Sequence, residues 1–111
     1  MNYQIELTNQ AKNDLDEIYG YIALTLLSPD VAANMCHSII DCIRSLDSMP
    51  LRNALTDDEP WKSRGLRRCF VKNYTIFYLV DEVNAIVRIV RIMYSGRDIR
   101  YQLSEQNSPN S

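Results

Sequence analysis

The sequence predicts an α+β fold in which a two-helix antiparallel hairpin packs on one small, mostly antiparallel sheet. Three observations lead to this prediction. Residues 2–7 alternate between polar and apolar side chains, which is typical of a half-buried strand. Residues 10–46 repeat apolar side chains at steps of three and four, which is typical of helices. Residues 66–94 hold three strand-like segments, so the predicted order is strand–helix–helix–strand–strand–strand in two layers.

The helical part divides at Ser28, which is followed by proline and aspartate. The first helix is expected from Gln10 over about 17 residues, with the Thr8 hydroxyl accepting a hydrogen bond from a first-turn N–H. Ser28 is the expected N-cap of the second helix, which we expect to end at Pro50. Because the link is short, the helices should pack antiparallel. The acidic residues of the first helix are expected mainly away from its apolar stripe: Asp14, Asp16 and Glu17.

The three C-terminal strands are predicted at 66–71, 74–80 and 85–94, joined by short turns into an antiparallel meander. The middle segment is nearly all apolar and aromatic, as in a central strand buried on both faces. In the last strand Arg91 is expected on one face with Ile89 and Met93. Residues 48–65 form a long connection of a length that is usually functional or disordered. Residues 97–103 are expected to form a short helix or an added strand.

The charges are distributed unevenly along the chain. Residues 1–59 carry three basic and ten acidic side chains, whereas residues 60–101 carry nine basic and three acidic ones. This asymmetry indicates either an anionic partner for the C-terminal half or charges scattered over a solvated surface. The length predicts a single domain at 1–105 with a flexible tail at 106–111.

Several classes of protein are disfavoured by the composition. No segment approaches the roughly 18 apolar residues of a membrane span, and the N-terminus does not resemble a signal peptide, so we expect a cytoplasmic protein. Three cysteines without paired spacing argue against a disulfide framework. A single histidine, His37, offers no zinc ligand set, and we expect neither a metal nor a cofactor.

The order of elements at this length resembles the RelE/ParE toxin superfamily. The opening of the first helix and the close of the second resemble the ParE branch, and so do the terminal strands. The phrases that carry the resemblance are Leu7-Thr8-x-x-Ala11-x-x-Asp14-Leu15, Ile43-x-x-Leu46-x-x-Met49-Pro50, Gly65-Leu66-Arg67, Asn73-Tyr74-Thr75-Ile76-Phe77-Tyr78 and Val90-Arg91-Ile92-Met93-Tyr94-x-x-Arg97-Asp98. Together they span about residues 3–100, and their order and spacing are more specific than any one phrase.

The resemblance implies the toxin of a bacterial type II toxin–antitoxin module, which arrests growth when it is free of its cognate antitoxin. RelE-like members cut messenger RNA in the ribosome, and this is the first mechanism expected for the chain, which would make it an endoribonuclease. ParE-like members poison DNA gyrase without cleavage chemistry of their own. A third alternative is a degenerate member that only binds an antitoxin. The fold does not choose among these alternatives, because function resides in the site.

For RNA cleavage, the resemblance places the catalytic residues on the terminal strands. Arg68 falls where a RelE lysine neutralises the phosphate, and Tyr94 falls where related toxins often carry histidine. Arg97 is a candidate phosphate clamp or proton donor. A phenol is a weak acid, so Tyr94 would need neighbouring cations to act as a base. The RelE pattern is incomplete here, because an arginine position is occupied by Thr75 and a lysine position by Leu66.

The remaining basic residues are candidates for binding a nucleic acid or an acidic antitoxin segment. Arg91 has two interpretations, since it could face a substrate or pair with a buried acid. Tyr94 could equally be an ordinary aromatic at the end of a strand. The candidate binding residues are Lys62, Arg64, Arg67, Arg91 and Arg100.

Overall fold

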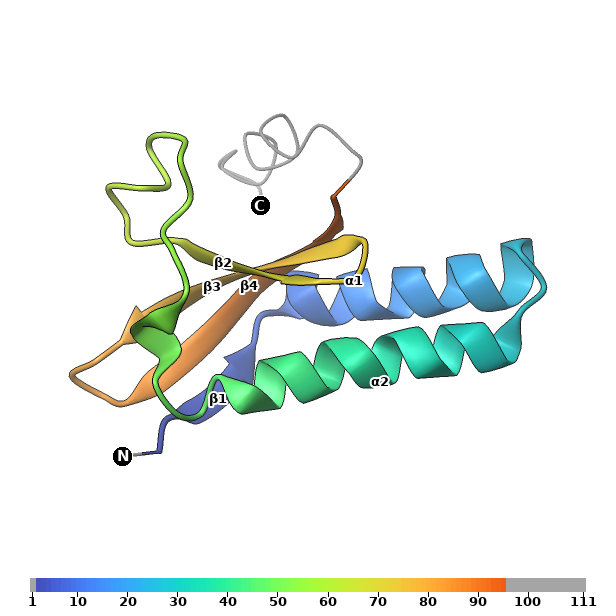
Figure 1. Cartoon of the computed structure of the whole chain (residues 1–111), viewed down its shortest axis with the longest axis horizontal. Helices are drawn as coiled ribbons and strands as arrows, with labels where there is room; N and C mark the ends of the chain where they lie inside the picture. The colour runs from blue at the N-terminus through green and yellow to red at the C-terminus, as the bar shows by residue number, and fades with distance from the viewer. Residues whose placement is uncertain (1, 96–111) are drawn as a thin grey trace.

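The computed structural model describes residues 2–95, and within this range the strands form one sheet with the order β1-β4-β3-β2 (Figure 1). β1 runs parallel to β4, and the other two pairs are antiparallel. The predicted α+β class with a mostly antiparallel sheet is therefore confirmed. The strands are β1 at Gln4–Leu7, β2 at Arg67–Val71, β3 at Tyr74–Asp81 and β4 at Ile86–Tyr94.

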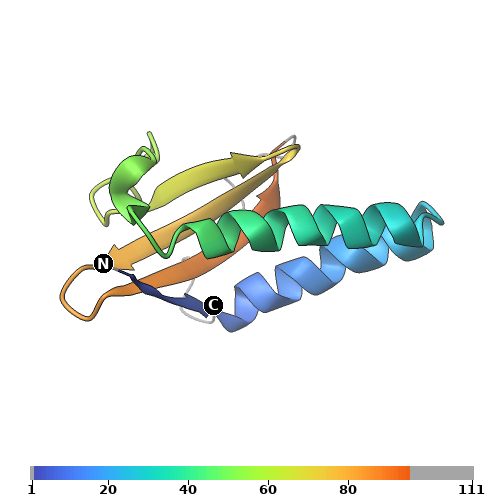
Figure 2. The same cartoon turned by 60° about the horizontal axis from the view of Figure 1, so that its bottom comes forward.

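Two helices, α1 at Asn9–Gly20 and α2 at Pro29–Ser45, lie antiparallel on one face of the sheet (Figures 1 and 2). Helical geometry continues beyond α1 as the π-helix η1 at Tyr21–Thr25. The end where η1 meets α2 projects beyond the sheet in both views. The hairpin is therefore longer than the sheet that supports it, and its tip has no sheet beneath it.

The prediction that Pro50 ends the second helix is wrong. α2 ends at Ser45, and Pro50 instead begins the short 3₁₀ helix η2 at Pro50–Arg52. The Arg52 guanidinium donates to the carbonyl oxygens of Ser45 and Ser48, at 3.3 and 2.7 Å. A cation at this end satisfies carbonyl groups that the last helical turn leaves without partners.

The core lies on both faces of β3. Tyr78 and Ile76 are fully buried against the helices, on the helix side of the sheet. Phe77 belongs to a smaller cluster on the far face, the face turned away from the helices. Tyr78 also donates a buried hydrogen bond of 2.7 Å to the Pro50 carbonyl oxygen, which fixes the start of the long connection. The predicted central strand, buried on both faces, is confirmed.

A bulge in β4 changes which side chains share a face. Phe77 pairs with Arg91 and Tyr78 pairs with Ile89, so Val90 is an extra residue. Ile89 consequently lies on the helix side, whereas Met93 joins the far-face cluster. The prediction that Ile89, Arg91 and Met93 share one face is therefore wrong. A pattern of strict alternation does not reveal a bulge.

Several predictions fall on residues that the structure does not describe. The helix or strand expected at 97–103 and the flexible tail at 106–111 lie outside residues 2–95, as do Arg97 and Arg100. Among the residues that are described, no helix has the length and apolar composition needed to cross a membrane.

The caps of the two helices generate a first prediction. The Thr8 hydroxyl accepts from the Ala11 N–H at 3.1 Å and donates to the Val90 carbonyl at 2.9 Å. Ser28 occupies the N-cap of α2, but its hydroxyl makes no capping bond and donates to the Leu26 carbonyl instead. We expect Thr8→Ala to lower the free energy of unfolding by about 1–2 kcal/mol.

The matched control is Ser28→Ala, for which we expect a loss of less than about 0.5 kcal/mol because no capping bond is removed. Urea denaturation followed by circular dichroism measures both values. Equal losses in the two variants would contradict the assigned cap and the tie between α1 and β4.

Candidate functional site

The exposed edge of β4 is closed by a buried carboxylate from α1. β1 stops opposite Ile89, so the next part of β4 has no neighbouring strand on that side. Asp14 Oδ2 accepts from the Ile92 N–H at 2.8 Å, as the carbonyl of a further strand would. Arg91 donates to both carboxylate oxygens, with Nε at 2.8 Å from Oδ2 and Nη2 at 3.0 Å from Oδ1. Of the two interpretations of Arg91, pairing with a buried acid is the one observed.

The expectation that Asp14 lies away from the apolar stripe is wrong, because only 8% of its surface is exposed. The spacing contained a signal for this burial. Ala11, Asp14 and Ile18 follow one another at steps of three and four, and all three are buried. A carboxylate in such a position needs a cationic partner, and the arginine of β4 supplies it.

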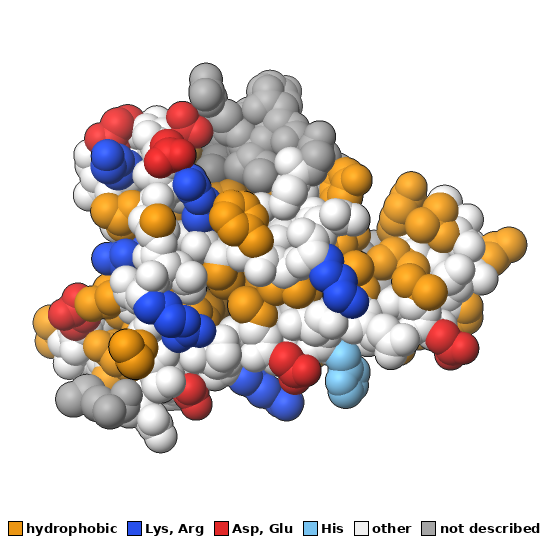
Figure 3. All heavy atoms as spheres, viewed as in Figure 1, with side chains coloured by type: hydrophobic (Ala, Val, Ile, Leu, Met, Phe, Trp, Pro, Cys, Tyr) orange, Lys and Arg blue, Asp and Glu red, His pale blue; other side chains and the backbone are white. Residues whose placement is uncertain are grey.

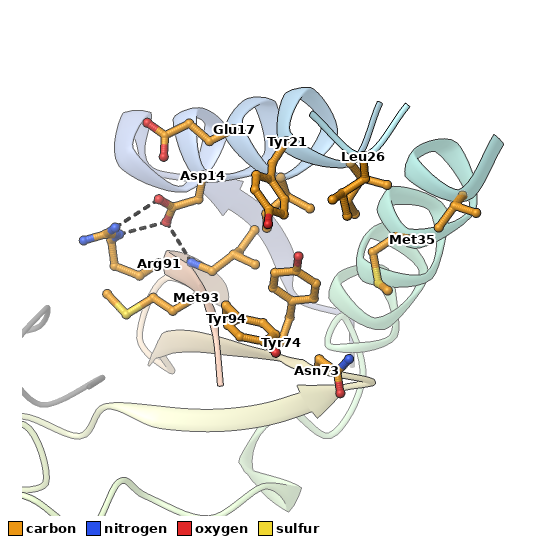
Figure 4. Close-up of a pocket in the computed structure, with 14 residues that line it drawn as sticks. Asp14, Glu17, Tyr21, Leu26, Met35, Asn73, Tyr74, Arg91, Met93 and Tyr94 are labelled. Carbon is orange, nitrogen blue, oxygen red and sulfur yellow. Dashed lines mark hydrogen bonds and ion pairs between the residues drawn. The ribbon is translucent and has the colours of Figure 1, made fainter. Parts of the chain in front are cut away.

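An apolar groove with a volume of about 570 Å³ lies between the projecting end of the hairpin and the end of the sheet. In Figure 4, Tyr21 of the hairpin and Tyr74 of β3 point toward one another across it. Tyr94 lies at the rim with 45% of its surface exposed, and its ring meets that of Tyr74 edge to face at 5.7 Å. Further apolar lining comes from the hairpin: Ile18, Ile22, Leu26, Val31 and Met35.

Large hydrophobic side chains surround this groove at the hairpin tip. Figure 3 shows hydrophobic atoms gathered over the projecting end of the helices. No charged residue occurs between Glu17 and Asp30 in the sequence. An apolar patch of this kind usually marks a surface that binds another protein. Its exposed members are Tyr19, Tyr21, Leu24, Leu26, Leu27 and Val31.

A second, smaller cleft of about 270 Å³ lies on the far face of the sheet. Arg68 lines it, with its guanidinium 3.2 Å from an Asp57 carboxylate oxygen and 5.8 Å from the centre of the Phe70 ring. Asp58 lines the same cleft. The one arginine of the lining therefore shares the cleft with two carboxylates, which weakens the attraction of this cleft for a phosphate.

The structure does not bring the predicted catalytic residues together. Arg68 pairs with Phe77 across the sheet and faces the far-face cleft. Tyr94 pairs with Tyr74 and faces the groove on the helix side. The sheet therefore separates Arg68 from Tyr94, while Arg97 lies outside the described residues.

The candidate binding residues are also divided. Lys62 and Arg64 are exposed on the long connection, where the Arg64 guanidinium lies 5.2 Å from the centre of the Trp61 ring. Arg67 donates to the Asn53 carbonyl oxygen at 2.6 Å and so supports the connection. Arg91 is held by Asp14, and Arg100 is not described. Of the described candidate binding residues, Lys62 and Arg64 are thus exposed, whereas Arg67 and Arg91 bond to groups of the chain itself.

Comparison with known proteins decides the family. The family model for the ParE toxin of the type II toxin–antitoxin system, parDE, matches residues 5–99. The chain belongs to the ParE toxin family. The predicted membership of the RelE/ParE superfamily is therefore confirmed. No curated protein matches this ParE-family chain.

Solved structures agree with the fold of this ParE-family chain. The chromosomal ParDE toxin–antitoxin system of Pseudomonas aeruginosa matches with a TM-score of 0.68 and 22% identity, over 83% of this chain and 95% of that one. The toxin–antitoxin complex RelBE2 of Mycobacterium tuberculosis matches with a TM-score of 0.61 and 21% identity, over 85% of this chain and 92% of that one. A mutant of Escherichia coli RelE in the free state matches with a TM-score of 0.66 and 10% identity, over 96% of this chain and 97% of that one.

The buried pair generates a second prediction. Asp14→Asn keeps the shape of the side chain but leaves the Arg91 cation, whose side chain is only 12% exposed, without a countercharge. We expect the free energy of unfolding to fall by about 3 kcal/mol. Thermal and urea denaturation measure this loss.

Asp16→Asn is the matched control, because Asp16 is exposed on the same helix. It removes the same charge from the chain, and we expect a change within about 0.5 kcal/mol. A similar loss in both variants would contradict the role given to the Asp14 carboxylate.

Proposed function

We propose that this chain is the toxin of a type II toxin–antitoxin module, and that it arrests growth by binding DNA gyrase rather than by cutting RNA. The observation that carries the proposal is the separation of the candidate catalytic residues by the sheet. Arg68 and Tyr94 lie on opposite faces, and Arg91 is committed to Asp14. Membership of the ParE family supports the same choice, since ParE-like toxins poison gyrase. The proposed target places the activity in the cytoplasm.

Electrostatics support this choice over RNA cleavage. Cleavage needs a group that takes the proton of the ribose hydroxyl and a cation that relieves charge on the same phosphate. Among the described residues, Arg68 is the arginine of the far-face cleft, and Asp57 and Asp58 line that cleft beside it. A gyrase poison has no such requirement, because it acts through contact with a protein surface.

Ribosome-dependent RNA cleavage is the second candidate, and one observation favours it. Phe70 is 64% exposed beside Arg68, so a base could stack on the ring while the guanidinium contacts a phosphate. A degenerate member without toxicity is the third candidate and predicts normal growth when the chain is produced alone.

The target is tested with purified gyrase, supercoiled plasmid and ATP. We expect the chain to trap cleaved DNA, seen as linear plasmid after detergent and protease treatment. The double variant Arg68→Gln, Tyr94→Phe should trap as much DNA as the unchanged chain, because neither residue takes part in chemistry. For a ribonuclease, the same variant should lose roughly 100-fold in activity.

Mapping of transcript ends after induction tests the ribonuclease alternative. Transcripts cut during growth arrest, with no DNA trapped by gyrase at a large excess of the chain, would overturn the gyrase proposal. They would establish the ribonuclease alternative in its place.

We further propose that the cognate antitoxin docks a segment across the apolar groove and the hairpin, and that it covers some of the exposed basic residues. The apolar lining and the exposed tip support this docking, because both leave large side chains without cover. The related ParDE and RelBE2 structures are of toxin–antitoxin systems, which supports a partner of this kind here.

Two matched leucine or valine variants test this surface. Leu26 lines the groove, whereas Val83 is 93% exposed in the turn between β3 and β4, at the other end of those strands from the groove. We expect Leu26→Lys to weaken binding of the co-expressed antitoxin at least about 10-fold, because a charge enters the apolar contact. Val83→Lys should change the dissociation constant much less, because it adds the same charge outside the groove and the hairpin tip. Titration calorimetry measures both constants, and equal effects would contradict docking in the groove.

A further inference from the structure

Two cysteines from distant parts of the sequence meet at the contact between α2 and β2. The sulfur of Cys42, on α2, lies 3.5 Å from that of Cys69, on β2, although 27 positions separate the residues in the sequence. Cys69 is buried, and Cys42 is partly exposed. The two sulfurs are in contact but not bonded, so the distance between them must shorten by about 1.5 Å to reach the roughly 2.05 Å of a disulfide.

From this geometry we propose that Cys42 and Cys69 form a thiol–disulfide exchange site, which low-molecular-weight disulfides convert to a reversible Cys42–Cys69 disulfide. The inference is independent of the proposed function, because it concerns the fold and not the target. Cys36 lies six positions before Cys42 on the same helix and points in a different direction. It therefore serves as an internal control.

The exposure of the two sulfurs sets the order of the exchange. The Cys42 thiolate attacks one sulfur of the small disulfide, forms a mixed disulfide and releases one small thiolate. The Cys69 thiol then loses its proton to solvent and attacks the Cys42 sulfur, which releases the second small thiolate. Both thiolates take up protons. Two cysteine thiols are oxidised, and one small disulfide is reduced to two thiols.

The surroundings of Cys42 favour the first step. The hydrogen bond from Cys69 lowers the pKa of Cys42 to about 7 against the opposing effect of burial, and the Arg52 guanidinium lowers it further. A thiol with such a pKa is about half ionised near pH 7, and the thiolate is the form that attacks a disulfide. The same contact raises the pKa of Cys69, with burial adding to the rise. Once Cys42 is in the mixed disulfide, its negative charge no longer disfavours ionisation of Cys69.

The disulfide would fasten the long connection at both ends. The loop between Cys42 and Cys69 contains η2 and the residues that line the far-face cleft from the connection. Closing a loop of this size restricts the unfolded chain and so stabilises the folded one. Neither cysteine lines the groove or the cleft, so both surfaces stay open. Oxidation would thus raise the stability of the folded protein without covering the surfaces on which binding is proposed.

The test uses the purified, fully reduced chain and an excess of oxidised glutathione. After exchange, the remaining thiols are alkylated, and the intact mass and the peptide map are recorded. We expect one alkylated cysteine, Cys36, together with a peptide that joins Cys42 to Cys69 and no retained glutathione. The melting temperature should rise by roughly 10 °C and return to its starting value after treatment with dithiothreitol.

Two variants complete the test. Cys36→Ser should form the disulfide and show the full rise in melting temperature, whereas Cys42→Ser should show neither. A stable glutathione adduct on Cys42, a linkage that includes Cys36, or three unmodified thiols would overturn the proposal. If Cys42→Ser fails to fold, the peptide map of the unchanged chain still decides between these outcomes.

Discussion

The Asp14 carboxylate occupies the place that a further strand would take along β4. β1 covers this edge only as far as Ile89, and beyond that point the backbone needs another acceptor. Asp14 provides it for the Ile92 N–H and at the same time holds the Arg91 guanidinium. The position of α1 on the sheet depends on this contact together with the Thr8 cap. Because α1 is fixed in this way, the hairpin leaves the sheet at a defined angle, and the groove has defined walls.

The same contact engages one arginine of the basic half of the chain. Nine basic side chains in residues 60–101 suggest a surface for an anionic partner. In the described part of that half, however, three of the four strand arginines, Arg68, Arg88 and Arg91, already pair with an acidic side chain of the same chain. The fourth, Arg67, donates to a backbone carbonyl oxygen of the long connection. Internal pairing of this kind stabilises the fold or orders a loop, and it reduces the charge that remains for a phosphate. This distribution is one of the observations that support the protein target we propose.

Unlike these paired arginines, many apolar side chains of the hairpin have no partner within the described residues. The hairpin extends past the sheet, so the side chains that would continue its buried seam have nothing to pack on, and they form the tip and the groove wall. At the other end of α2, packing on β2 is close enough to bring two thiols into contact. One helix therefore carries uncovered apolar side chains at its start and a close contact with the sheet at its end.

The sequence by itself determined the order of elements, the hairpin, the buried central strand and the family, because these follow from local periodicity, turn chemistry and the spacing of short phrases. Asp14 could have been found from its helical spacing with Ala11 and Ile18, but its partner could not. Only the tertiary structure decided that Val90 forms a bulge, that Arg68 and Tyr94 lie on opposite faces, and that Cys42 meets Cys69. The physical reason is that one extra residue in a strand reverses the faces that follow it. Contacts between residues far apart in the sequence depend on how the layers pack, which the pattern of single elements does not contain.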